Sequence, residues 1–275
     1  QNISCQQCHM PNLGEESILL AAGYETVPRS PFFLHEFAGA NVQMLKILKD
    51  NSDTLGLKAT GEQFDHTISQ TENMLQFNTL QLELSLVQRT FDTAFFEVHL
   101  QNMAGHKFPS GYPSRRAVVQ FFVQNDTGDT LFASGRYNPD YSLVDEDIPY
   151  EPHYQIINQP EQVEIYEMVM VDADQNFTTI LNRAFTPIKD NRLVPIGFST
   201  ADNVYDTTFI AGNALNDPDF NFENGEEGSG SDRLYYHIPM NEYQGILTVT
   251  ATVLYQTIHP RWLSDMFNDE TPEIN

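Results

Sequence analysis

The chain has 275 residues, of which 38 are acidic and 14 are basic, so its formal net charge is −24. A charge of this sign repels nucleic acids and anionic membrane surfaces, and we expect neither as a partner. Apolar residues make up 40% of the chain and aromatic residues 12%, which predicts a packed core. The sequence contains no apolar run of about 18 residues, so we expect no membrane span.

The segment Cys5-Gln6-Gln7-Cys8-His9 contains the only two cysteines of the chain. A C-x-x-C-H run is the attachment pattern of a c-type haem, in which the two thiols bind the porphyrin and the histidine binds the iron. We therefore predict one covalent haem c on Cys5 and Cys8, with His9 as the proximal ligand. A zinc site would need about four ligands, a thioredoxin-like pair would lie near a βαβ pattern, and a disulfide would not require His9.

Haem c is attached outside the cytoplasm, so the motif predicts an extracytoplasmic location: the periplasm, the cell surface or the medium. The sequence shows no signal peptide. We expect either that Gln1 is a processed terminus or that the sequence is the last part of a longer chain.

Residues 1–30 contain several Pro and Gly residues, which predict a loop. Apolar residues at helical spacing predict helices over residues 38–50 and 60–78. Thr60 and Gln63 have the spacing of a capping box at the start of the second helix. We expect residues 1–79 to form a haem-binding segment with two helices.

From residue 80 onward, short alternating apolar runs are separated by turn residues, which predicts a large antiparallel β-sandwich over residues 80–275. The expected strands cover residues 80–88, 94–102, 117–125, 130–135, 163–172 and 247–257. Residues 200–233 are polar and rich in Gly, Asp and Asn, and we expect them to form a long surface insertion. The predicted fold class is thus mainly β with a small N-terminal α/loop segment.

Several segments together resemble the C-terminal part of extracytoplasmic multihaem c-type cytochromes. The similar segments are C-x-x-C-H-M-P at residues 5–11, H-x-F-x-G-x-N at 35–41 and G-H-x-x-P-S-G-x-P-S-R-R at 105–116, with looser matches at 189–193 and 253–256. The resemblance implies electron transfer and a β-domain appended to the haem segment. This chain departs from the family in having one haem motif where members have several, so a haem wire would need several chains or further haem segments upstream.

The sixth ligand of the iron is the main open question, and His35 and His106 are the favoured candidates. We expect His35 to open a helix among small residues that admit a porphyrin face, and His106 to lie in a rigid Gly/Pro-rich loop. His66 is a weaker candidate, His99 is expected to be structural, and the histidines at 153, 237 and 259 are poor candidates. The resemblance implies that a downstream histidine can serve a different haem, so ligation across a subunit interface is also open.

Arg115 and Arg116 form the only paired basic site, which could bind haem propionates or form ion pairs with nearby carboxylates. Two oxygen-rich runs, at residues 172–176 and 216–221, could bind calcium, although most such runs are solvated turns.

The function we predict is electron transfer through a bis-histidine haem c, without substrate chemistry. The partners would be other haem proteins or copies of this chain, with possible self-assembly through haem contacts. Two alternatives stay open. One is a haem enzyme with an open iron face, of the peroxidase or nitrogen-oxyanion reductase type, with His106, Lys107, Tyr112 and Arg115 as polar groups. The other is a cell-surface binding module with an accessory haem.

Overall fold

The computed structural model of the chain describes residues 4–10, 12–14, 30–146 and 149–267. It divides into two compact units, Gln1–Leu80 and Gln81–Asn275, and each unit is described by itself below. Among the described residues, no helix is long and apolar enough to cross a membrane.

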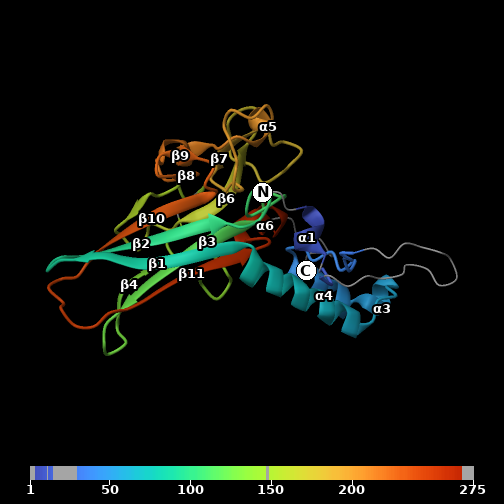
Figure 1. Cartoon of the computed structure of the whole chain (residues 1–275), viewed down its shortest axis with the longest axis horizontal. Helices are drawn as coiled ribbons and strands as arrows, with labels where there is room; N and C mark the ends of the chain where they lie inside the picture. The colour runs from blue at the N-terminus through green and yellow to red at the C-terminus, as the bar shows by residue number, and fades with distance from the viewer. Residues whose placement is uncertain (1–3, 11, 15–29, 147–148, 268–275) are drawn as a thin grey trace. The chain divides into compact units, whose positions relative to one another are not determined.

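The first unit is helical. Its elements are α1 (Cys5–His9), α2 (Val42–Asp50), α3 (Ser52–Leu55), α4 (Gly61–Asn73) and the π-helical turn η1 (Met74–Asn78) (Figure 1). The helix expected over residues 38–50 begins only at Val42, because the side chain of Asn41 accepts a hydrogen bond from the Met44 amide at 2.9 Å and caps it there. Of the loop expected over residues 1–30, residues 15–29 lie outside the described residues, and Cys5–His9 is helical.

The start of α4 follows the prediction. Thr60 Oγ1 accepts from the Gln63 amide at 3.3 Å, and the Thr60 amide donates to Gln63 Oε1 at 2.9 Å, so the capping box is confirmed. The apolar positions Phe64 and Ile68 of α4 are buried, and Lys49 of α2 pairs with Asp65 of α4 at 2.6 Å. The helix then continues into the π-helical turn and reaches the first strand without a loop.

The second unit is mainly β, as predicted. Its principal strands are β1 (Leu80–Arg89), β2 (Thr93–Asn102), β3 (Arg116–Gln124), β4 (Thr130–Ser134), β5 (Ile156–Ile157), β6 (Ile165–Val171), β7 (Thr186–Asp190), β10 (Ser231–Pro239) and β11 (Thr248–Gln256). One sheet has the order β1-β2-β10-β5, and the other has the order β11-β3-β6-β7, with β4 also paired to β3. The pairs β2–β10 and β3–β11 run antiparallel (Figure 1). The short strand β5 runs parallel to β10.

Alternating side chains hold the two sheets together. In β2 every second residue from Ala94 to Asn102 is buried, because successive strand residues point to opposite faces. Phe121 of β3 packs against two aromatic rings of the opposite sheet. Its ring centroid lies 5.7 Å from that of Phe96 and 3.8 Å from that of Tyr236. These contacts form the apolar interior of a sandwich.

The region from 186 to 239 differs most from the prediction. Strands β7 and β10 were not predicted, and residues 200–233 are not simply a surface insertion. They contain α5 (Tyr205–Thr208), η2 (Gly212–Asn216) and the hairpin of β8 (Phe222–Glu223) and β9 (Glu226–Glu227), and they end inside β10. Four of their polar residues, Asp217, Asn221, Ser231 and Asp232, are buried. The polar composition therefore reflects buried hydrogen bonding as well as exposure.

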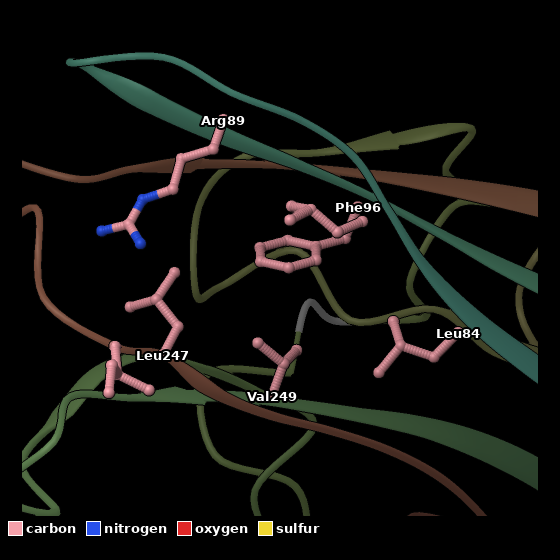
Figure 2. A pocket seen from close by; sticks show the side chains of 7 residues that line it. Leu84, Arg89, Phe96, Leu247 and Val249 are labelled. Atoms are coloured by element: carbon pink, nitrogen blue, oxygen red, sulfur yellow. The ribbon is translucent and has the colours of Figure 1, made fainter.

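The sandwich is open between β1 and β11. A cavity of about 440 Å³ lies there. The side chains that line it are Leu84, Leu86, Arg89, Phe96, Ile246, Leu247 and Val249 (Figure 2). Arg89 bounds the cavity and donates hydrogen bonds to the carbonyls of Tyr243 and Gly245, both at 2.8 Å. The alternation expected in β1 holds as far as Leu84, and Leu86 is exposed.

Candidate haem attachment site

The two cysteines and His9 are presented by the short helix α1. Cys5 and Cys8 are three residues apart and His9 is four residues after Cys5, so all three lie on neighbouring positions of one helical face. Both thiols are free and exposed. The amide of Ser4 donates to Gln7 Oε1 at 2.7 Å, which fixes the beginning of the helix. The motif is therefore already arranged as a set of two thiols and one imidazole.

The imidazole of His9 is fixed by a backbone group. Its Nδ1 lies 2.6 Å from the carbonyl oxygen of Ala38, and the Ala38 amide donates to the carbonyl of His9 at 3.0 Å. A carbonyl can only accept, so Nδ1 carries a proton, and in the neutral ring this leaves the lone pair on Nε2. A histidine that ligates a metal commonly donates its other N–H in this way, because the bond sets both tautomer and ring orientation. The site thus fits an iron bound through Nε2 of His9.

His35 lies in an irregular segment, not at the start of a helix as we expected. The segment places it three residues before Ala38, so its Cα lies within about 11 Å of that of Ala38. Its ring is exposed and stacks on Phe37, with ring centroids 5.6 Å apart. The same short segment therefore orients His9 and presents a second histidine to solvent.

Glu36, in that segment, accepts a hydrogen bond from His66. The distance from His66 Nε2 to Glu36 Oε1 is 3.0 Å, and the His66 side chain is 56% exposed. This contact joins α4 to the segment 35–38. His66 therefore has a structural partner within the first unit.

His106 lies in the second unit, in the loop between β2 and β3. The Asn102 side chain holds this loop by donating to the carbonyls of His106 at 2.8 Å and Leu193 at 2.9 Å. Lys107 Nζ pairs with Asp190 at 2.8 Å, and burial lowers the pKa of Lys107 although Asp190 acts in the opposite direction. The ring of His106 is exposed. The structure thus places this histidine on a firmly anchored loop.

The two arginines have different surroundings. Arg116 is buried, and its guanidinium contacts Glu146 at 2.7 Å and Gln256 Oε1 at 2.7 Å. This is the ion-pair alternative of the sequence analysis. Arg115 donates to the carbonyl of Ser110 at 2.9 Å, within the loop. A role of either arginine in binding propionates stays a prediction.

The oxygen-rich runs are turns and loop contacts. Asp172 accepts from the amides of Asp174 and Asn176, both at 2.9 Å, and the bond from Asn176 is the main cause that lowers the pKa of Asp172. In the other run, Asp219 accepts from Gln155 and Asn221 donates to the carbonyl of Phe198. Calcium binding at either run stays a prediction.

The remaining histidines all lie in the second unit. His99 and His237 are on β2 and β10, and His237 contacts Phe95 edge to face at 4.9 Å. His259 and His153 are buried. The sequence predicted His153 to be a poor ligand candidate, but the structure surrounds it with the carboxylates of Glu164, Asp217 and Asp232.

Comparison with known proteins gives little support beyond these observations. No protein-family model matches the chain, and no curated protein matches it. The crystal structure of a penta-haem cytochrome c552 from Thermochromatium tepidum aligns with 100% of this chain at a TM-score of 0.49 and 15% identity. The alignment covers 45% of that cytochrome, so this chain spans less than half of its length. Similarity of this extent does not establish a shared function.

Proposed function

We propose that this chain is a c-type cytochrome that transfers electrons through one covalently bound haem. The observation that carries the proposal is the bond between His9 Nδ1 and the Ala38 carbonyl, on a helix that also exposes both cysteines. Cys5 and Cys8 would hold the porphyrin and His9 the iron, and the bound haem would supply the one-electron redox centre. The protein would then be extracytoplasmic, where haem c is attached.

The proposed sixth ligand is His35, with His106 as the second candidate. His35 is supported by its exposure and by its place in the segment that orients His9. The choice of His106 as second candidate is supported by the hydrogen bond from Asn102 that holds its loop. A histidine in this position would make the iron six-coordinate, which suits electron transfer rather than substrate binding. If the ligand acts across an interface, the partner is a second copy of the chain or another haem protein.

The alternative of a haem enzyme with an open iron face would need free polar groups. Lys107 and Arg115 are both engaged, by Asp190 and by the carbonyl of Ser110. Their engagement supports electron transfer over catalysis. Absorption and electron paramagnetic resonance spectra of the oxidised protein separate the two functions, because six-coordinate bis-histidine iron is low-spin and an open site is high-spin.

Covalent attachment is tested by denaturation. The unfolded chain should keep its haem, with the mass of one porphyrin added to the chain. Each single variant, Cys5→Ala or Cys8→Ala, should keep at most one thioether. The double variant has no thiol left, because the chain has only two cysteines, and it should release its haem into acid-acetone. Extraction of the haem from the wild-type chain would refute c-type attachment.

The sixth ligand is tested by His35→Ala and His106→Ala, with His237→Ala as the control. Loss of the true ligand should give high-spin iron that binds carbon monoxide, while the control stays low-spin. If the ligand acts in trans, the same variant should also weaken self-association in sedimentation experiments. Low-spin spectra in both variants would exclude His35 and His106 and direct attention to His66.

A further inference from the structure

A cluster of ionisable side chains is buried between the two sheets of the second unit, far from the haem motif in sequence. His153 comes from the segment before β5, Asp217 from the end of η2 and Asp232 from β10. All three are buried, and one ligand atom from each lies within 4.8 Å of the others. It is the group with this property among the residues that the structure describes.

The imidazole of His153 is oriented from one side. Its Nδ1 lies 2.8 Å from Glu164 Oε1, and Glu164 is itself fixed by the amide of Tyr154 at 2.7 Å and by Asn191 Nδ2 at 2.8 Å. A carboxylate that accepts from one ring nitrogen of a histidine is a common support of a metal-binding histidine, because it directs the other nitrogen to the ion. In this cluster the other nitrogen is Nε2.

The Nε2 atom of His153 faces the two aspartates. It lies 3.1 Å from Asp217 Oδ2 and 3.8 Å from Asp232 Oδ2. Tetrahedral zinc sites have metal–ligand bonds of about 2.0–2.1 Å, so their ligand atoms lie about 3.3 Å apart. The two observed distances fall on either side of this value, so small movements would bring the three atoms around one ion.

Charge is unbalanced in the cluster. Glu164, Asp217 and Asp232 are carboxylates around one imidazole, and all have almost no exposure to solvent. Buried carboxylates at this spacing are stabilised by a cation or by protons.

A neighbouring polar group also lacks a partner. The hydroxyl of Tyr236 is fully buried without a hydrogen bond. Burial raises the pKa of Tyr236, and the charge of Glu164 raises it further. Tyr236 and Asp232 lie four residues apart on β10, on the same inward face. By contrast, the hydroxyl of Tyr166 donates to Asp232 Oδ2 at 2.6 Å and supports that carboxylate. The Tyr236 hydroxyl is therefore an unsatisfied buried donor on the inward face of β10 that also carries Asp232.

We propose that His153, Asp217 and Asp232 bind a divalent transition-metal ion, for which zinc is the probe, and that Glu164 positions His153. One imidazole and two carboxylates form a mixed nitrogen and oxygen donor set, which suits zinc better than calcium, because calcium prefers oxygen ligands. The ion would tie a loop, η2 and β10 together inside the sandwich. The residues of this site are different from those of the haem motif, and the site does not depend on the proposed function.

The test measures zinc per chain and thermal stability in the purified full-length protein. The metal content is determined by mass spectrometry and the protein by amino-acid analysis, so haem iron does not enter the result. Wild-type protein should contain about one zinc, and chelation should lower its unfolding midpoint. Restoring zinc should restore the midpoint, whereas calcium at the same concentration should not.

Three variants and one control locate the site. Asp217→Asn and Asp232→Asn should each lower zinc affinity at least about 10-fold, and Glu164→Gln about 10- to 100-fold. The control Asp140→Asn changes an exposed carboxylate outside both oxygen-rich runs and should bind zinc as the wild type does. Circular dichroism checks that each variant is folded, and the milder Glu164→Gln tests the site even if an aspartate variant does not fold.

Two kinds of result would overturn the proposal. Wild-type protein with substoichiometric zinc and no midpoint shift would show that the cluster is held by protons, as an imidazolium bonded to Glu164 and Asp217. Equal zinc binding by wild type and all three variants would show that zinc binds elsewhere in the protein. Stabilisation by calcium and not by zinc would show that the site does not bind a transition-metal ion.

Discussion

His259 offers a direct test of the electrostatics inside the second unit. Its side chain is 3% exposed, and it lies at the start of α6 (Pro260–Phe267). Burial lowers the pKa of His259, and the neighbouring guanidinium groups of Arg116 and Arg261 lower it further, to about 2. The folded protein therefore keeps this imidazole neutral, whereas the unfolded chain protonates it near pH 6.5.

The sign of the effect on stability follows from proton binding. Below pH 6.5 the unfolded chain binds a proton at His259 that the folded protein does not bind, so the free energy of unfolding falls as pH falls. Each pH unit below 6.5 costs about 1.4 kcal/mol until the pH approaches the folded pKa. Between pH 7.5 and pH 5.0, His259 should thus lower the stability by about 2 kcal/mol.

Urea unfolding of wild type and His259→Gln at both pH values measures this contribution. The only tryptophan of the chain, Trp262, lies 6.4 Å from His259 between ring centroids, and its fluorescence reports on this region together with circular dichroism. At pH 7.5 the imidazole is neutral in both states, so the difference between the two proteins there gives the packing effect alone. The wild type should then lose about 2 kcal/mol more than the variant at pH 5.0. Equal losses would refute a depressed pKa for His259.

Three further substitutions test packing, ion pairing and capping. Phe121→Ala should cost about 3–5 kcal/mol in urea unfolding, because the ring is fully buried against the opposite sheet; a cost below about 1 kcal/mol would contradict the sandwich contact. Glu146→Ala should cost about 3–5 kcal/mol in the same assay, because its Oε1 pairs with Arg116 at 2.7 Å and Arg261 at 3.0 Å and both are mostly buried. Thr60→Ala should weaken α4 by about 1 kcal/mol in amide exchange, since it removes the cap; unchanged exchange would show that the cap contributes nothing.

Local patterns made much of the fold predictable. The capping box at Thr60 and the alternation of strands such as Thr93–Asn102 depend on residues a few positions apart, so the sequence displays them directly. The prediction that His35 opens a helix was wrong, because the small residues after it were assigned to the helix. Asn41 is the N-cap of this helix, and its residue type is a signal for a helix start. Strand β10 was missed because its inward positions include Asp232, and a charged residue breaks an apolar alternation.

The two candidate sites differ in what a sequence can reveal about them. Cys5, Cys8 and His9 lie within five residues, so their spacing alone predicts the chemistry, and folding adds the bond to Ala38. The atoms around His153 come from residues 11, 64 and 79 positions away, and each is an ordinary polar residue in its own segment.

Tertiary folding brings the residues around His153 together, because His153 lies in a loop, Asp217 follows η2, Glu164 precedes β6 and Asp232 is on β10. Strand β10, which the sequence did not predict, supplies both Asp232 and the unpaired hydroxyl of Tyr236. A β-sandwich that served only as a scaffold could fill this buried site with apolar residues at little cost, since buried ion pairs rarely add net stability. One histidine and three carboxylates occupy the site instead, as the proposed metal site requires, and the zinc measurements decide between a bound cation and bound protons.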